Sequence, residues 1–349
     1  MILRRVMEMS HITLNTTIHE IFHHPQIGDL NPYLIYCLDR DLWLNEHVNA
    51  IMDQPLTAAK EINWSPEGIL KGMNFLLDEL EQDRVRQHFI YSEEEAQEDP
   101  QKKEICLLEF QPEKVQPEKP VIVLASGGGY NSVCNIAESF PTASHFVEKG
   151  YSVFALSYRV SCPRTMIAAL EDLKKAVRWL FQNDTKLGYD LKQYGYVVGG
   201  YSAGGNLVCN YGAPNIGWKA ADLPKPICLF PIYPFIDLFE WGDRPEGEAE
   251  FLIRRLGENY KDLQHQYNVA EHVDSDYPPC YIACGRDDAT VGIRDSELLK
   301  TLLDQAGVPA VLDAADHAAH GFGDGTGTEL EGWPERALVF LEQNNRSEF

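Results

Sequence analysis

The sequence predicts an α/β fold in which a doubly wound, mostly parallel sheet is flanked by helices. Short apolar segments such as residues 120–125 alternate with longer segments of helical apolar spacing such as residues 167–182. Several short segments are apolar without interruption, as parallel strands are when helices cover both faces of their sheet. The 349 residues, 44% of them hydrophobic, suffice for one large α/β domain with an appendage, or for two domains.

Residues 1–95 are predicted to form a helical N-terminal extension. Ser65 and Pro66 are a helix start, with proline at the first helical position, and apolar residues follow at helical spacing. Shorter helices are predicted over residues 13–22 and 56–62. Two roles are open for this extension: a packed layer without chemistry of its own, or a wall of a ligand pocket.

A charged, exposed connection over residues 93–103 leads into a predicted α/β domain of residues 104–349. Because strands and helices alternate there, ligands are expected at the carboxyl ends of the strands. The alternation lapses between residues 235 and 276, where an insert with a short helix at 250–256 has the place of a lid. The predicted strands are 104–110, 120–125, 151–157, 194–199, 226–232, 279–285 and 309–313, and the predicted helices are 140–149, 167–182, 203–211, 293–306 and 334–342.

Charge and composition exclude several classes of protein. The formal net charge of -23 disfavours nucleic acid and anionic membrane surfaces as partners. No apolar run approaches the length of a membrane span, and no apolar core follows Arg4 and Arg5, so a signal peptide is not expected. The eight cysteines lack metal-type spacing and several lie inside apolar strands, which is typical of reduced thiols. We expect a cytoplasmic protein with no metal and no cofactor.

A predicted buried strand runs into the sequence Gly200-Tyr201-Ser202-Ala203-Gly204 and then into a helix. In a G-x-S-x-G sequence of this kind the serine occupies a strained strand-to-helix turn, and its hydroxyl is exposed at the end of the sheet. The flanking glycines let the backbones of strand and helix pass close to each other. The pentapeptide alone does not separate a nucleophile from a loop that holds a phosphate. The choice between these two functions therefore depends on whether the chain also supplies a base and an acid for Ser202.

A nucleophilic serine requires a histidine base that is itself oriented by an acid, and on this fold both follow the serine in the order acid, then histidine. A late predicted strand ends at Asp287 and Asp288, and only His317 and His320 come after it. His320 is preferred as the base because the following glycine allows a tight loop. Asp288 is preferred as the acid because it lies in a Gly-x-x-Asp-x-x-Val frame. Asp287 and His317 are the alternatives.

Acyl transfer also requires hydrogen-bond donors for a tetrahedral oxyanion. Three consecutive glycines, 127–129, follow the predicted strand at 120–125. Without side chains, their backbone N–H groups can turn into a cavity. We expect the amides of Gly128 and Gly129, with that of Ala203, to form an oxyanion hole. A Walker-type phosphate loop is excluded because no Lys-Ser or Lys-Thr follows the glycines.

Taken together, these residues resemble the α/β-hydrolase esterases, in particular the bacterial acetyl-esterase and hormone-sensitive-lipase-like group. The resemblance covers about residues 104–345 and implies an α/β-hydrolase fold. One departure is Ser126, which stands where much of the family has histidine before its glycines, so the geometry of the oxyanion loop is expected to differ. The segments that carry the match are 126–130, 157–160, 172–180, 200–205, 231–234, 285–291 and 320–322.

The resemblance implies a serine carboxylic ester hydrolase that works through an acyl-enzyme. Short acyl groups such as acetyl are expected, because the motif context is similar to that of sugar-ester esterases and no broad apolar lid helix is present. Charged and aromatic residues of the insert are expected either to contact a polar alcohol such as a sugar or to form a solvated face; they are Phe235, Phe239, Trp241, Asp243, Arg244, Arg254 and Arg255. The implied site residues are Ser202 as nucleophile, Asp288 as acid, His320 as base, and the amides of Gly128, Gly129 and Ala203 as oxyanion donors.

Two other functions compete with this one. An oligopeptidase or aminopeptidase-like hydrolase is suggested by a resemblance to the prolyl-oligopeptidase hydrolase domain, although about 90 N-terminal residues are too few for a propeller. A catalytically silent binding protein would usually lack the serine or the histidine, and both are present. The expected partner is a small-molecule ester, with no nucleic acid and no membrane, and self-association is left open.

Overall fold

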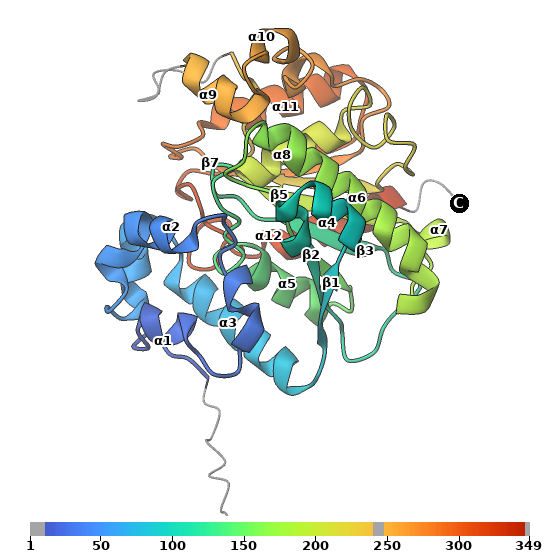
Figure 1. Ribbon diagram of the computed structural model, residues 1–349. Helices are drawn as coiled ribbons and strands as arrows, with labels where there is room; N and C mark the ends of the chain where they lie inside the picture. Colours follow the sequence, from blue (N-terminus) through green and yellow to red (C-terminus); the bar gives the residue numbers. More distant parts are fainter. Residues whose placement is uncertain (1–10, 240–247, 346–349) are drawn as a thin grey trace, which may run out of the picture.

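The computed structural model describes residues 11–239 and 248–345 (Figure 1). Its centre is an eight-stranded sheet in the order β1-β2-β4-β3-β5-β6-β7-β8. The first two strands of this order run antiparallel to their neighbours, and every pair from β4 to β8 is parallel. This confirms the predicted fold class. The strands are β1 (Val85–Phe89), β2 (Cys106–Phe110), β3 (Val121–Ala125), β4 (Val153–Ser157), β5 (Tyr196–Tyr201), β6 (Cys228–Ile232), β7 (Cys280–Gly285) and β8 (Ala310–Ala315).

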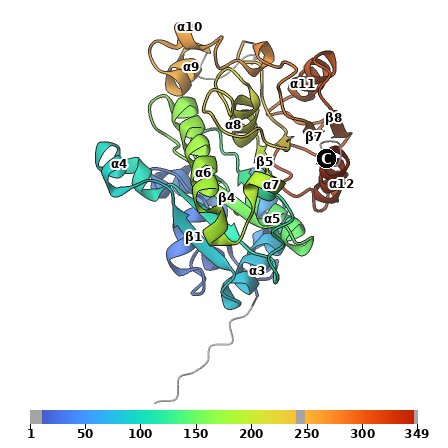
Figure 2. The same ribbon diagram turned by 90° about the vertical axis from the view of Figure 1, so that its right-hand side faces the viewer.

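Helices cover both faces of the sheet (Figure 2). On one face α8 (Ala203–Gly212) packs on β5 and β6, with α6 (Thr165–Leu187) beside it and α11 (Ile293–Gln305) on β7 and β8. On the other face α5 (Ser139–Glu148) packs on β4 and against α12 (Trp333–Asn345). Strands β3 to β7 are buried along their whole length, which explains their uninterrupted apolar sequences.

The N-terminal residues form a layer against the α5 face. Its main helix, α3 (Pro66–Glu81), begins as predicted, because the Ser65 hydroxyl accepts a hydrogen bond from the amide of Gly68. A Cβ atom on Gly72 would lie 2.6 Å from the backbone nitrogen of Pro141, so glycine lets α3 and α5 approach closely. The other N-terminal helices are α1 (Ile18–Phe22), α2 (Arg40–His47) and 3₁₀ helices at Gly28–Tyr33, Asn49–Ile51 and Leu56–Ile62.

Three sequence predictions for this region need correction. The helix expected at residues 13–22 begins only at Ile18, because Thr17 caps it. The segment 56–62 is a 3₁₀ helix, and α2 was not predicted. Residues 93–103 contain the short helices α4 (Glu93–Glu98) and Pro100–Glu104, although their side chains are mostly exposed as expected. A capping box between Ser92 and Glu95 starts α4.

The expected boundary between a helical extension and the sheet also shifts. Strand β1 lies before residue 95 and pairs antiparallel with β2, with Val85 opposite Phe110. This edge strand is half-exposed and has no apolar run, so its own sequence does not reveal it. Pairing with the fully buried β2 supplies the stabilisation that local propensity lacks.

The remaining elements lie near the carboxyl ends of the strands. They are α9 (Glu248–Leu256), α10 (Tyr260–Leu263) and a 3₁₀ helix at Val269–Glu271, whereas α7 (Leu191–Tyr194) leads into the amino end of β5. All eight cysteines are free, and seven of them are buried. In the described ranges 11–239 and 248–345, no helix combines the length and apolarity needed to cross a bilayer.

Candidate active site

Ser202 occupies the turn between β5 and α8 with a φ of 51° and a ψ of -116°. This left-handed conformation is uncommon for a residue with a side chain. A Cβ atom on Gly200 would lie 2.3 Å from the carbonyl oxygen of Gly204, and one on Gly204 would lie 2.0 Å from the carbonyl oxygen of Ala125. Both positions therefore require glycine, and the strained turn holds the serine at the carboxyl ends of the strands.

The structure brings the preferred base and acid to this serine. Nε2 of His320 lies 2.9 Å from Oγ of Ser202, and its Nδ1 lies 2.7 Å from Oδ2 of Asp288. The other oxygen of Asp288 accepts hydrogen bonds from the amides of Thr290 and Val291, both at 2.8 Å. The Asp288 side chain is fully buried, so the loop fixes one oxygen and directs the other at the imidazole.

The alternative acid and base pair with each other instead, at the surface. Oδ2 of Asp287 lies 3.5 Å from Nδ1 of His317, whose side chain is 79% exposed, compared with 16% for His320. Oδ1 of Asp287 accepts a hydrogen bond of 2.9 Å from the amide of Ala318. Within residues 11–239 and 248–345, neither Asp287 nor His317 forms a hydrogen bond or ion pair with Ser202, and Asp287 instead stabilises the loop between β8 and His320.

The glycine loop after β3 faces the same serine. Gly128 and Gly129 have positive φ values of 132° and 63°, and a Cβ atom on Gly128 would lie 2.3 Å from the carbonyl oxygen of Ser132. Within the described part of the chain, the amides of Gly128, Gly129 and Ala203 donate no hydrogen bond. All three residues line the pocket that contains Ser202. Unpaired backbone donors in this position are suited to a developing negative charge.

Ser126, the departure from the family pattern, fixes the base of the loop. Its side chain is buried, and its hydroxyl donates a hydrogen bond of 3.0 Å to Oδ1 of Asn135 and accepts one from the amide of Ser139. Its carbonyl oxygen accepts a hydrogen bond of 2.6 Å from the phenol of Tyr158. The serine thus ties the loop to the start of α5.

The pocket around Ser202 has a volume of about 310 Å³ and has walls from three parts of the chain. Asn63 and Trp64 come from the N-terminal layer, whose backbone also pairs with the loop after the glycines through Tyr36 and Val133. Of the two roles left open for this layer, the structure therefore shows the wall of a pocket. The lining residues are Ile62, Asn63, Trp64, Gly128, Gly129, Tyr130, Cys134, Glu138, Ser202, Ala203, Phe235, Phe251, Arg255, Thr290, His320 and Gly321.

The insert supplies the opposite wall. Phe235, Phe251 and Arg255 line the pocket, and Nη2 of Arg255 donates a hydrogen bond of 2.9 Å to the carbonyl oxygen of Gly129. Phe239 lies instead against His265, with 4.9 Å between the ring centroids. The expected contacts of Trp241, Asp243 and Arg244 fall outside the described residues.

Glu138 is a pocket residue that the sequence interpretation missed. It is buried, its carboxylate accepts hydrogen bonds from the amide of Gly127 and the phenol of Tyr233, and it lies at the start of α5. Burial raises the pKa of its carboxyl to about 7, although these hydrogen bonds and the nearby His320 favour the charged form. An acidic residue ahead of an apolar helix that follows a glycine loop is the sequence signal that could have identified it.

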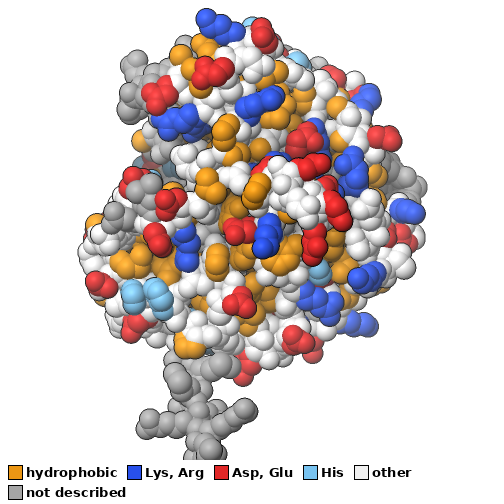
Figure 3. All heavy atoms as spheres, viewed as in Figure 1, with side chains coloured by type: hydrophobic (Ala, Val, Ile, Leu, Met, Phe, Trp, Pro, Cys, Tyr) orange, Lys and Arg blue, Asp and Glu red, His pale blue; other side chains and the backbone are white. Residues whose placement is uncertain are grey.

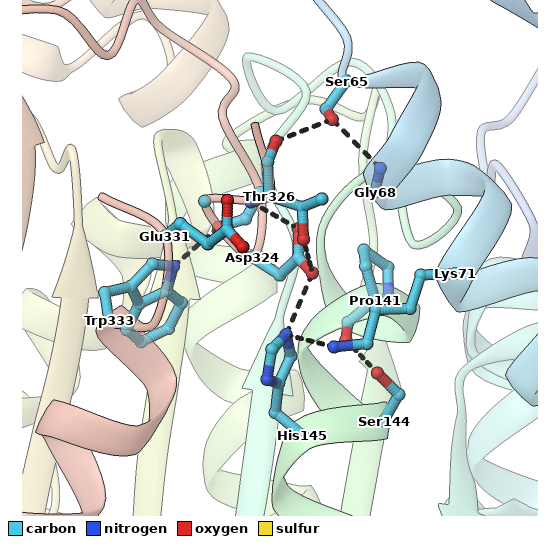
Figure 4. A network of polar contacts seen from close by, with 12 residues as sticks. Ser65, Gly68, Lys71, Pro141, Ser144, His145, Asp324, Thr326, Glu331 and Trp333 are labelled. Atoms are coloured by element: carbon cyan, nitrogen blue, oxygen red, sulfur yellow. Dashed lines mark hydrogen bonds and ion pairs between the residues drawn. The ribbon is translucent and has the colours of Figure 1, made fainter. Parts of the chain in front are cut away.

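A polar network around His145 and Asp324 anchors the segment that follows His320 (Figure 4). Oδ2 of Asp324 lies 3.0 Å from Nε2 of His145, and Nζ of Lys71 in α3 lies 2.7 Å from the same nitrogen. Nδ1 of His145 lies 2.6 Å from Oε1 of Glu335. The network therefore joins the N-terminal layer, α5, and both ends of the segment between His320 and α12.

A model of the BD-FAE family matches residues 109–303, which is more than half of the chain. The chain belongs to the BD-FAE family. This membership confirms the resemblance to α/β-hydrolase esterases, and the family match covers the glycine loop, Ser202 and Asp288 but ends before His320. In residues 11–239 and 248–345, no cluster of three or more His, Cys, Asp or Glu side chains has the arrangement of a metal site.

Characterised relatives of this BD-FAE chain include two kinds of hydrolase. Esterase LipI of Mycobacterium tuberculosis is 30% identical over 228 residues, which are 59% of this chain and 67% of that protein. Endo-1,4-beta-xylanase B of Butyrivibrio fibrisolvens is 25% identical over 242 residues, which are 66% of this chain. The chain spans only 37% of the length of that xylanase.

Solved structures with the same fold include two esterases. An acetyl ester-xyloside bifunctional hydrolase from Caldicellulosiruptor lactoaceticus is 25% identical, with a TM-score of 0.58 over 68% of this chain and 88% of that one. A thermophilic esterase from Thermogutta terrifontis, with bound propionate, is 25% identical, with a TM-score of 0.60 over 75% of this chain and 95% of that one. The BD-FAE chain therefore has an α/β-hydrolase fold, and the structures most similar to it include esterases.

Proposed function

We propose that this chain is a serine carboxylic ester hydrolase that cleaves short-chain, acetyl-type esters, including esters of sugars. The observation that carries the proposal is the continuous contact from Asp288 through His320 to Ser202, which ends at a pocket lined by unpaired amides. Membership in the BD-FAE family and the named esterases among its relatives support the reaction class.

The proposed reaction has two similar halves. Oγ of Ser202 attacks the ester carbonyl carbon while its proton passes to Nε2 of His320, and Asp288 stabilises the resulting imidazolium. The amides of Gly128, Gly129 and Ala203 receive the oxyanion. Collapse of the tetrahedral intermediate breaks the bond to the alcohol oxygen, which leaves with the proton from His320. Water then attacks the acyl-enzyme by the same route and releases the acid.

The size and lining of the pocket support a short acyl group. A volume of about 310 Å³ is at the lower limit of typical ligand sites, which favours a small acyl group next to Ser202. Trp64, Phe235 and Phe251 provide apolar surface for the acyl chain or the face of a sugar ring. The acetyl ester-xyloside hydrolase among the similar structures supports a sugar ester as the natural substrate.

The test is hydrolysis of p-nitrophenyl esters of increasing acyl length, together with acetylated xylose and p-nitroanilides of amino acids. We expect the highest kcat/KM for acetate to butyrate, and loss of at least about 10³-fold activity in Ser202→Ala. Ser92→Ala, which removes an exposed cap of α4, is the matched control and should retain full activity. An active Ser202→Ala variant would contradict the mechanism. Faster cleavage of the anilides than of the esters would support a peptidase instead.

A further inference from the structure

A second hollow of about 630 Å³ adjoins the pocket of Ser202. It lies between the loop that precedes α6, residues 161–165, and the end of α9, and it shares the residues Tyr130 and Arg255 with the first pocket. Tyr130 and Arg255 line both spaces, so the hollow borders the pocket of Ser202 along these two side chains.

The lining of this hollow is positively charged, in contrast to the protein as a whole. The chain has 53 acidic and 30 basic residues, yet Arg164, Arg254 and Arg255 line the hollow against a single carboxylate, Glu258. On the face in Figure 3 acidic side chains are scattered widely, with Lys and Arg side chains among them. The protein as a whole has a net charge of -23, so a concave site with three arginines differs in sign from its surroundings. Such a site favours an anionic ligand.

Two of the three arginines already interact with other groups of the protein. Arg255 is buried, its guanidinium stacks on the ring of Phe251 at 4.1 Å from the centroid, and it donates to Gly129 of the glycine loop. Arg254 lies 2.8 Å from Glu250 on the same helix. Arg164 is exposed, and it makes no ion pair with any side chain in the described ranges. Its charge is therefore available to a ligand without breaking a pair.

The backbone around Arg164 reinforces this charge. Arg164 is the N-cap residue of α6, a helix of 23 residues, and its side chain makes no capping hydrogen bond. The first turn of α6 also contains no acidic residue that would offset the positive end of the helix dipole. Ser161 and Arg164 both have positive φ values, 55° and 61°. Such strained positions cluster at ligand-binding sites, and here both line the same hollow.

We propose that this hollow binds an anionic group, such as a carboxylate, carried by the ester that is cleaved at Ser202. Arg164 holds the charged group while the ester carbonyl lies against the glycine loop, so the preferred substrate is an acidic ester. This inference rests on the proposed esterase function and specifies its substrate class. The charge can belong to the alcohol half or to the acyl half of the ester.

The experiment compares two matched pairs of esters. In the first pair, 4-acetoxybenzoate and its methyl ester differ only in a charge on the alcohol half. In the second, p-nitrophenyl hydrogen adipate and p-nitrophenyl methyl adipate carry either a carboxylate or its methyl ester on the acyl half. We expect kcat/KM to favour the acid in at least one pair by about tenfold, as one charge-assisted hydrogen bond provides. The preference should shrink in 0.5 M NaCl because salt screens exposed charges.

Three variants assign the effect to Arg164. Arg164→Gln should abolish the preference for the acid within each pair, whereas Arg164→Lys should retain most of that preference. Arg178→Gln, an exposed arginine farther along α6, is the matched control and should behave as the wild type. Equal kcat/KM values within both pairs, or equal preferences in Arg164→Gln and Arg178→Gln, would overturn the inference. Failure of the esterase function itself would look different, because no ester of either pair would then be cleaved in a Ser202-dependent manner.

Discussion

The phenol of Tyr233 donates a hydrogen bond of 2.9 Å to Oε1 of Glu138, while the tyrosine ring lies 4.8 Å from the imidazole ring of His320. The second oxygen of Glu138 accepts a hydrogen bond from the amide of Gly127, directly before the glycines of the oxyanion loop. One buried carboxyl thus connects the loop expected to hold the oxyanion with the residue expected to act as base.

Glu138→Gln should flatten the pH dependence of stability between pH 4.5 and 7. Because the folded-state pKa of Glu138 is raised from 4.5 to about 7, the native state keeps a proton that the unfolded state has lost. This contribution to stability is fully present below pH 4.5 and is lost as the pH rises through 7, by about 3 kcal/mol in all. Urea denaturation of both proteins at intervals from pH 4.5 to 8 measures it. Parallel curves for wild type and variant would contradict the assignment.

Asp288→Asn should reduce kcat by about 10⁴-fold, because the amide cannot hold His320 in the required tautomer. Asp287→Asn should reduce it less than about tenfold, since Asp287 contacts the exposed His317 and a loop amide. Steady-state kinetics with p-nitrophenyl acetate compare the two variants, whose side chains are equal in size. A larger loss in Asp287→Asn would reverse the assignment of the acid.

Trp64→Ala should raise KM for short esters several-fold while leaving the fold intact. Trp64 lines the pocket of Ser202 from the N-terminal layer, and its removal takes away apolar surface that a bound ester would cover. Trp43 stacks near it, with 6.4 Å between the ring centroids, but does not line the pocket. Trp43→Ala is therefore the control, with unchanged KM expected. Equal KM values for both variants would show that the layer does not contact the substrate.

His145→Gln should destabilise the protein at pH 6 by about 3 kcal/mol, because it leaves the carboxylate of Asp324 buried without its cationic partner. Burial and the neighbouring ammonium group of Lys71 lower the pKa of His145, but hydrogen bonds with Asp324 and Glu335 raise it overall. This stabilisation is present below pH 6.5 and disappears as the pH rises through the raised pKa, so the two proteins should converge in stability at alkaline pH. Thermal unfolding between pH 6 and 9 tests this. A difference in Tm that does not change with pH would contradict a charged His145.

The sequence by itself determined the central features of this protein. Continuous apolar segments predicted strands β3 to β7, since a strand buried on both faces can contain little else. The glycines around Ser202 and after β3 predicted a tight turn and an open loop. A side chain at these positions would collide with the backbone, so the requirement for glycine is visible in the local sequence. The order of serine, acid and histidine along the chain predicted Ser202, Asp288 and His320 as a group, and the structure brings their side chains into contact.

Only the tertiary structure decided which neighbours these residues meet. Asp287 and Asp288 are adjacent and chemically alike, and the loop after β7 turns one inward and the other outward. The local sequence does not reveal the roles of strand β1, Trp64 and Glu138. Their neighbours in the structure come from segments that are distant in sequence. Pairing, burial and the shift of a pKa depend on those long-range contacts, so they are absent from any short stretch of sequence. The pocket in front of Ser202 is for the same reason a property of the assembled chain.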